Sequence, residues 1–236
     1  MVIECLWEHN GEDTLLHAVH LPGCAVRGKS LREAEEKMPR EAAAFSHWCG
    51  IAMEELPSVQ VVCEKVSDLN IADADSDVLY DSEREPLSRE EYERLKALAL
   101  KSARDFHALY ASVPDKTESV LQQRNTFYGP LPRTAEEMYR HTKGVNAYYF
   151  AEIGIDADNE GSIYDCRVRG FETLEQTEAF LDNRVFDGSY GELWSLRKLL
   201  RRFLWHDRIH ARAMFRMAEK TFGAGSTADP FFFRDA

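Results

Sequence analysis

Hydrophobic residues are concentrated in two short segments near the start of the chain, and polar residues separate the two. Residues 2–7 and 14–19 are predicted to be strands, and the Asn10-Gly11 pair between them is typical of a hairpin turn. A run rich in β-branched residues at 59–66 predicts a third strand. Between the strands, Ser30-Leu-Arg-Glu33 has capping-box spacing and opens an amphipathic helix. The expected apolar face of that helix is Leu31, Ala34, Met38, Ala42, Phe45 and Trp48. Residues 1–68 are therefore predicted to form an α+β domain of the order β-β-α-β.

The period changes to that of helices after an acidic segment at 69–88, which is interpreted as a solvated linker. Three capping boxes begin at Ser88, Thr134 and Thr173, and each precedes an amphipathic run. The third helix is expected over about 173–186 and a fourth over about 190–220, which ends before Gly223. The pattern thus predicts an all-α four-helix bundle over residues 89–222 and a tail over 223–236.

The last of these helices carries two histidines on its apolar side. His206 and His210 fall in one stripe with leucine, phenylalanine and methionine residues, and imidazoles four residues apart can bind one cation. A second stripe, expected to be solvated, consists of Arg197, Arg201, Arg208 and Arg212.

His141 has the same placement on the predicted second helix, where it follows helical spacing with Met138, Val145 and Tyr149. Three neutral imidazoles that converge in a bundle would suit Zn²⁺, Ni²⁺ or Fe²⁺ and leave a position for water or substrate. The alternative is that these histidines are hydrogen-bonded core residues without a metal. Cys166 or Glu152 could close the metal shell as a fourth ligand, which would favour a structural site.

Composition narrows the classes of function. The chain has 236 residues, a net charge of −12 and 44% hydrophobic residues, which is typical of a globular protein and argues against a general nucleic-acid or anionic-membrane binder. No run of 18 apolar residues and no signal-peptide pattern is present. Five cysteines without a C-x-x-C pair fit reduced thiols better than a disulfide framework. A cytoplasmic location is expected.

The N-terminal segment resembles a known family. The run from His20 to Ala34, with its Pro-Gly-Cys…Gly turn and the helix start Ser-Leu-Arg-Glu-Ala, followed by Glu41-Ala42 and Trp48, looks like the HicB-like antitoxin fold. The resemblance covers about residues 1–68. It implies an accessory module for interaction or dimerisation, so a homodimer is one expected state.

The C-terminal half resembles the DinB-like family of metal-binding four-helix bundles over about residues 89–222. Arg133-Thr134-Ala135 leading to His141-Thr142, and Trp205-His206-x-x-x-His210, carry the resemblance. That family places one histidine on its second helix and two on its fourth, which implies His141, His206 and His210 as ligands of a divalent metal. Its relatives include thiol-dependent S-transferases and isomerases.

The resulting hypothesis is a metal-dependent enzyme of the thiol transferase, isomerase or hydrolase kind, which acts on a small thiol or an electrophilic substrate. The cation would lower the pKa of a thiol at its open position. Arg124 and Arg133, with Arg140, around Tyr128 are candidates to bind an anionic thiol cofactor, although a solvated charged face explains them equally well. The competing hypothesis is a non-enzymatic stress or regulatory protein with a structural metal and a partner-docking N-terminal domain.

Overall fold

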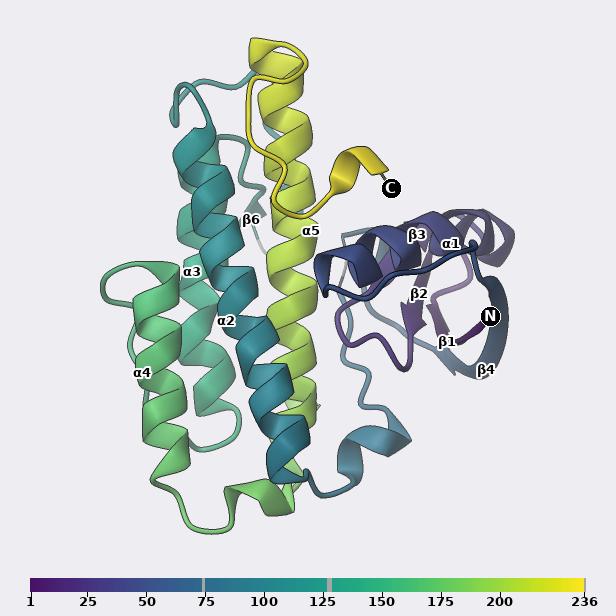
Figure 1. Ribbon diagram of the computed structural model, residues 1–236, viewed down its shortest axis with the longest axis vertical. Coiled ribbons are helices and arrows are strands. Elements are labelled where there is room, and N and C mark those ends of the chain that lie inside the picture. Colours follow the sequence, from purple (N-terminus) through teal and green to yellow (C-terminus); the bar gives the residue numbers. More distant parts are fainter. Residues whose placement is uncertain (74, 127–128, 236) are drawn as a thin grey trace. The chain divides into compact units, whose positions relative to one another are not determined.

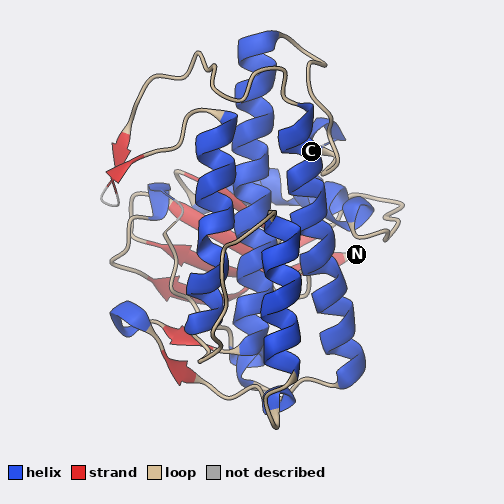
Figure 2. Cartoon of the chain, turned by 90° about the vertical axis from the view of Figure 1, so that its left-hand side faces the viewer, coloured by secondary structure: helices blue, strands red, loops and turns tan. Residues whose placement is uncertain are grey.

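The computed structural model describes residues 1–73, 75–126 and 129–235. The chain folds as two compact units: unit 1 is Met1–Asp81 with Phe231–Ala236, and unit 2 is Ser82–Pro230. Unit 1 holds a sheet and a helix, whereas unit 2 consists mainly of helices (Figure 1; Figure 2). The expectation of a mixed α+β chain, with strands first and helices afterwards, is confirmed.

Unit 1 contains a four-stranded sheet. Its strands are β1 Val2–His9, β2 Thr14–Ala18, β3 Ala25–Gly28 and β4 Ser58–Val66. They lie in the order β3-β2-β1-β4, with β1 antiparallel to β2, β2 antiparallel to β3 and β4 parallel to β1. The predicted β-β-α-β order is therefore corrected to β-β-β-α-β. A strand of four residues is too short to show a period of two, so the sequence pattern did not predict β3.

The turn between β1 and β2 is the predicted Asn-Gly hairpin. The side-chain oxygen of Asn10 accepts the backbone N–H groups of Glu12 and Asp13 at 3.0 and 2.9 Å. Gly11 adopts a φ of +90°, a conformation that glycine reaches without a Cβ clash. The turn is therefore built by local side-chain chemistry.

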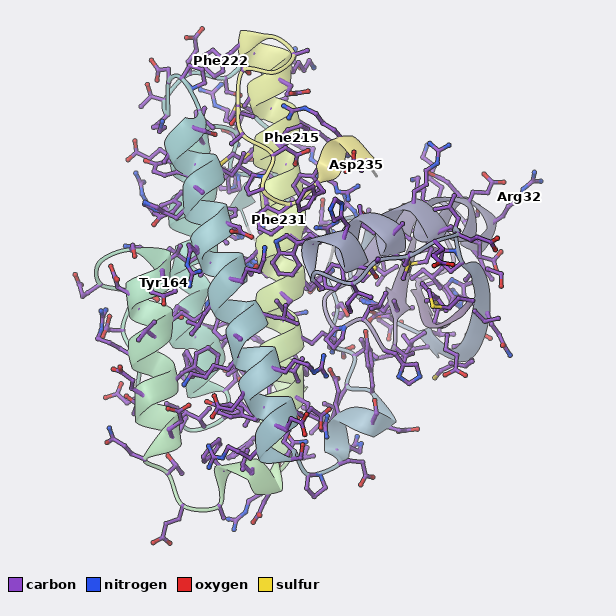
Figure 3. All side chains as sticks on the ribbon, viewed as in Figure 1. Arg32, Tyr164, Phe215, Phe222, Phe231 and Asp235 are labelled. Atoms are coloured by element: carbon purple, nitrogen blue, oxygen red, sulfur yellow. The ribbon has the colours of Figure 1, made fainter. Side chains whose placement is uncertain are left out.

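Helix α1 (Leu31–Trp48) begins at its predicted N-cap, because the Ser30 hydroxyl accepts the N–H of Glu33. Of the six expected face residues, all but Leu31 are buried. The helix packs on β2 and β3, and a Cβ at Gly28 would meet the backbone of Ser30 and Ala34 at 3.0 Å. On the exposed side, Arg32 projects away from the helix (Figure 3).

The last residues of the chain belong to unit 1. Phe231 is fully buried, and its ring stacks on that of Trp48 with a centroid separation of 5.5 Å. Phe232 stacks on His47 at 4.1 Å. Of the expected tail over 223–236, the part up to Pro230 is grouped with unit 2 and the part from Phe231 is grouped with unit 1.

The acidic segment 69–88 is shared between the two units. Ile71, Val78 and Tyr80 are buried in unit 1, where the last two pack on Leu6. Leu87 is buried in the core of unit 2. The segment is therefore not the solvated linker that its acidic residues predict, because its apolar residues supply packing on each side of the boundary.

Within its described residues, the α-helices of unit 2 are α2 Arg89–Ser112, α3 Ala135–Ala151, α4 Ile163–Glu175 and α5 Leu196–Phe222. Helix α2 packs on α4 and α5, and α3 likewise packs on α4 and α5. Ser88 and Thr134 are N-caps as predicted, and Gly223 ends α5 with a φ of +99°. Short pairs β5 Asn125–Thr126 with β6 Gly129–Pro130, and β7 Phe186–Asp187 with β8 Leu193–Trp194, lie in the connections.

The predicted third helix over 173–186 is wrong. Helix α4 starts at Ile163 under the N-cap Ser162, which forms a capping box with Asp165, and it ends near the position where the predicted helix begins. The Thr173 hydroxyl donates to the carbonyl of Arg169 inside the last turn. Gly170 lies in the middle of α4 because a Cβ there would overlap the Phe150 ring at 2.2 Å. This close approach outweighs the helix-breaking tendency of glycine.

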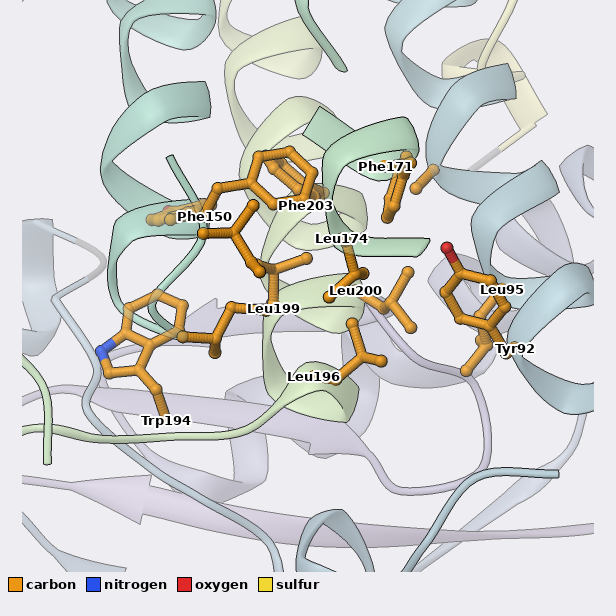
Figure 4. Packing of buried hydrophobic residues seen from close by; sticks show 14 of the residues in the cluster. Tyr92, Leu95, Phe150, Phe171, Leu174, Trp194, Leu196, Leu199, Leu200 and Phe203 are labelled. Carbon is orange, nitrogen blue, oxygen red and sulfur yellow. The ribbon is translucent and has the colours of Figure 1, made fainter. Parts of the chain in front are cut away.

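The core of unit 2 is rich in aromatic residues. The Phe203 ring of α5 lies between Phe150 of α3 at 5.4 Å and Phe171 of α4 at 6.2 Å, measured between centroids (Figure 4). Tyr92 of α2 and Trp194 of β8 extend the same cluster. The interdigitation of α3, α4 and α5 sets which faces of these helices meet.

Among the described residues, no helix is long and apolar enough to cross a membrane. No disulfide joins the five cysteines.

Candidate metal centre

Helix α5 places both of its histidines on the face that packs inward. Leu199, Phe203, Met214 and Met217 of the predicted stripe are buried, and His206 between them is 7% exposed. His210, one turn later, is half-buried. The amphipathic prediction for this face is therefore confirmed.

Helix α3 brings the third imidazole. The capping box of Thr134 and Glu137 sets the start of the helix, and Met138 and Tyr149 turn its apolar face towards α5. His141 lies on the edge of that face and keeps an exposed side. The site is thus bounded by one buried, one half-buried and one exposed imidazole, which gives it an approach from solvent.

The three histidines converge. Each offers a ring nitrogen, and these nitrogen atoms lie within 4.8 Å of one another. The ring of His141 is 5.3 Å from that of His206 and 4.6 Å from that of His210, and the last two are 4.4 Å apart, between centroids. A tetrahedral ion with bonds of 2.0–2.1 Å separates its nitrogen ligands by about 3.3 Å, so small rotations of the side chains suffice.

The electrostatics of this histidine cluster (His141, His206 and His210) favour neutral rings. Burial lowers the pKa of His206 well below its usual range, and the positive charge that His210, His141 and Arg202 can carry lowers it further. Burial also lowers the pKa of His141, although one side of the ring reaches solvent. A neutral imidazole has a free lone pair, which is the form that binds a metal.

One atom of the cluster is conspicuous for its lack of a hydrogen-bond partner. The Nδ1 atom of His206 is buried and makes no hydrogen bond to any residue within the described ranges. Leaving a buried polar nitrogen unpaired costs about 1–3 kcal/mol. A cation held by the cluster is chemically compatible with this donor set, because imidazole nitrogen suits Zn²⁺, Ni²⁺ and Fe²⁺.

No fourth protein ligand joins the group among the residues that the structure describes. The Cys166 thiol is buried, its pKa is raised by burial, and it donates to the carbonyl of Ile163. Glu152 accepts the N–H of Ser189 at 2.7 Å. Neither residue belongs to the histidine cluster, so the arrangement matches a three-ligand site rather than a closed one.

The second stripe of α5 is not solvated, which corrects the sequence analysis. Arg201 is buried and donates to Glu83 at 3.0 Å, and Arg197 donates to Glu91 at 2.8 Å. Arg208 is also buried. Long side chains can therefore occupy an enclosed face of α5 where carboxylates meet them.

A buried ion pair lies beside the cluster and was missed by sequence reasoning. Arg167 of α4 and Asp207 of α5 are both fully buried and form a two-pronged pair, with Nη2 to Oδ1 at 3.1 Å. Arg167 also donates to the carbonyl of Ala99 and covers the Phe203 ring at 4.0 Å. The pair joins α2, α4 and α5 at the level of His206, and it engages the carboxylate that follows His206 in the sequence.

Tyr149 and Arg202 also lie near the histidine cluster, and the sequence analysis did not identify them. The Tyr149 ring is 5.9 Å from that of His206, and the Arg202 guanidinium lies 5.6 Å from the Tyr149 ring. The spacing of Arg202 four residues before His206 was the available signal.

The predicted cofactor-binding residues remain a prediction. Arg124 and Arg133 are exposed, and neither is part of the histidine cluster. The backbone N–H of Arg133 donates to Glu137, and Arg140 pairs with Glu136 on the surface of α3. Tyr128 lies outside the described residues.

Comparisons of the chain with protein-family models, with curated proteins and with solved structures found no match. Function is therefore inferred from the histidine cluster itself.

Proposed function

We propose that unit 2 is a four-helix bundle of the DinB-like kind that binds one divalent metal ion through His141, His206 and His210. The convergence of three ring nitrogens within 4.8 Å, drawn from two helices, carries the proposal. The neutral state of the buried imidazole and the unpaired Nδ1 of His206 support it. Zn²⁺ and Ni²⁺ are the preferred ions, and Fe²⁺ also suits the donor set.

The metal would keep an exchangeable position, which makes this a candidate catalytic site. Structural zinc sites normally use four protein ligands, whereas catalytic sites use three and leave the fourth position to water or substrate. A divalent cation at this position lowers the pKa of a bound water or thiol. The resemblance to the DinB-like family supports a thiol-dependent S-transferase, isomerase or hydrolase as the proposed activity, with unit 1 as a HicB-like accessory module.

Metal content tests the ligand set. Purified protein should carry about one Zn²⁺ or Ni²⁺ per chain by elemental analysis, and His206→Ala should lose it while far-UV circular dichroism shows intact helices. Because the cation would lose one of three ligands, its affinity should fall by at least about 1,000-fold. His20→Ala is the matched control, since His20 is exposed and pairs only with Glu4 among the contacts described.

Two results would change this conclusion. Wild-type metal content in His206→Ala would contradict the ligand set. A fourth protein ligand in a metal-loaded crystal structure, with a Co²⁺ spectrum that no small thiol alters, would favour a structural metal in a non-enzymatic regulatory protein.

A further inference from the structure

We infer that the end of α1 carries a docking site for a peptide segment of a partner protein, and that the chain blocks this site with its own C-terminal strap, Phe231–Asp235. The segment that fits has two aromatic residues separated by one residue, with a carboxylate two positions after the second. This is the pattern of the strap itself. The inference concerns unit 1 alone and does not depend on the proposed metal site.

The strap contacts α1 as a short peptide ligand would. Phe231 is fully buried, and its ring stacks on that of Trp48, the last residue of α1, at 5.5 Å with an interplanar angle of 21°. The Phe233 ring stacks on Phe231 at 5.5 Å and 13°, and Phe45 packs on Trp48 at 5.5 Å. Figure 3 labels Phe231 and Asp235 at the two ends of the strap. Two rings of the strap thus share one apolar site, to which α1 contributes aromatic side chains.

His47 gives this site a polar edge. Its ring stacks on Phe232 at 4.1 Å, and its Nδ1 atom lies 3.8 Å from the Asp235 carboxylate. Both side chains of the second contact are largely exposed, so that contact contributes little to the free energy of docking. It contributes to selectivity instead, because it fixes which end of a bound segment carries the carboxylate.

The docked strap has a strained backbone. Phe232 has a φ of +59°, which an aromatic L-residue adopts only where its surroundings hold it. This conformation disfavours the docked strap by about tenfold. The strap is therefore bound less tightly than its contacts alone would allow, which permits another segment to displace it.

The covalent link decides which competitor can succeed. It gives the strap a high effective concentration at the site, so the site is blocked by default. A second copy of the chain offers the same strained segment without this advantage. A different protein, whose segment has the same pattern without the strain, is the occupant that the structure favours.

Peptide binding to the full chain tests the site. The probe is a fluorescent synthetic peptide of residues 229–236, and its binding is followed by fluorescence anisotropy. In the double variant Phe231→Ala/Phe233→Ala the strap should leave the site, because both buried rings are lost. The apparent affinity for the peptide should rise at least about tenfold over the wild type, since a blocked site binds only in the fraction of molecules whose strap is open.

Phe222→Ala is the matched control, because it removes an aromatic ring at the end of α5, outside the strap. It should bind the peptide as the wild type does. A peptide with serine at both aromatic positions of the pattern should not bind the double variant. Bound peptide should also protect the last turn of α1 from hydrogen–deuterium exchange. If the double variant does not fold by circular dichroism, Phe233→Ala decides the question, with an expected rise of about threefold.

Three results would overturn the inference. Equal affinity of the folded double variant and the wild type would show that the strap does not block the site. Failure of the peptide to bind the double variant would show that α1 does not hold such a segment in trans. A wild type that dimerises with rising concentration, together with a monomeric double variant, would identify a second copy as the occupant instead of a partner protein.

Discussion

Each unit buries a histidine, and the two imidazole rings have opposite electrostatic surroundings. His17 of β2 is 2% exposed, and its Nε2 lies 3.2 Å from the Glu8 carboxylate, which also accepts the Ser76 hydroxyl. His206 of α5 is 7% exposed but has two imidazoles and the Arg202 charge as neighbours. Both rings belong to the core, so burial alone does not distinguish them.

The difference lies in the charge around each ring. A carboxylate stabilises the protonated imidazole and orients it, which makes His17 part of a structural hydrogen-bond network. Neighbouring cations and imidazoles oppose protonation, so His206 keeps a lone pair that can bind a metal. The presence of a nearby carboxylate therefore separates a structural histidine from a candidate ligand in this protein.

Asp207 sharpens this point. It follows His206 directly in the sequence, yet its carboxylate is bound by the buried Arg167. Arg167 thus neutralises the carboxylate that is nearest to His206 in the sequence. Breaking a buried pair by removing one partner is costly, so the two residues stabilise α4 and α5 together.

The largest expected difference is in the free energy of unfolding of two leucine variants, one at each histidine. His17→Leu removes the imidazole that pairs with the buried Glu8 carboxylate and should destabilise unit 1 by about 3 kcal/mol. His206→Leu in metal-free protein removes an unpaired polar atom from the core, so the free energy of unfolding should stay within about 1 kcal/mol or increase.

Denaturant unfolding, with hydrogen–deuterium exchange to assign the change to β1–β2 or to α5, measures both effects. A loss of about 3 kcal/mol in metal-free His206→Leu would mean that its ring has a structural partner. The distinction between a structural His17 and a candidate metal ligand His206 would then be wrong.

Acid should weaken unit 1 through Glu8. Burial alone raises the pKa of Glu8, but the hydrogen bond and charge of His17, with the Ser76 hydroxyl and the Lys65 charge, outweigh it and leave the pKa below its ordinary value of 4.5. A carboxylate with a lowered folded-state pKa stabilises the fold above the unfolded pKa, and this contribution is lost as the pH falls through the folded value. Exchange protection of β1–β2 should therefore decline below about pH 4.5.

Glu8→Gln cannot titrate at this position, so its unit 1 should show a flatter pH profile than the wild type. Identical profiles in the two proteins would show that another group governs the acid sensitivity.

The smallest effect concerns the helix that carries Arg167. Ser162→Ala removes the N-cap of α4 and should cost about 1 kcal/mol, whereas Thr173→Ala should cost less than about 0.5 kcal/mol. Thermal unfolding of the two single variants measures the difference. A larger loss in Thr173→Ala would place the helix start at the position that the sequence pattern first indicated.

Local chemistry explains which parts of the fold could be predicted. Asn10-Gly11 builds its hairpin, and the caps at Ser30, Ser88 and Thr134 start their helices, because each signal involves atoms only a few residues apart. Ser162 was overlooked because its box ends in Asp165 rather than the more common Glu or Gln, and because Gly170 interrupts the pattern of α4.

The apolar stripes of α3 and α5 determined by themselves that His141, His206 and His210 lie on or beside inward faces, since helical spacing and hydrophobicity are properties of the chain alone. Only the tertiary structure decided which charges meet. Arg201 pairs with Glu83, which lies 118 residues away in the sequence, and Arg167 pairs with Asp207, which lies 40 residues away. The pairing of β1 with β2 brings His17 next to Glu8. Such partners depend on how helices and strands pack, because a buried charge is stable only where packing brings its counterpart within hydrogen-bond distance.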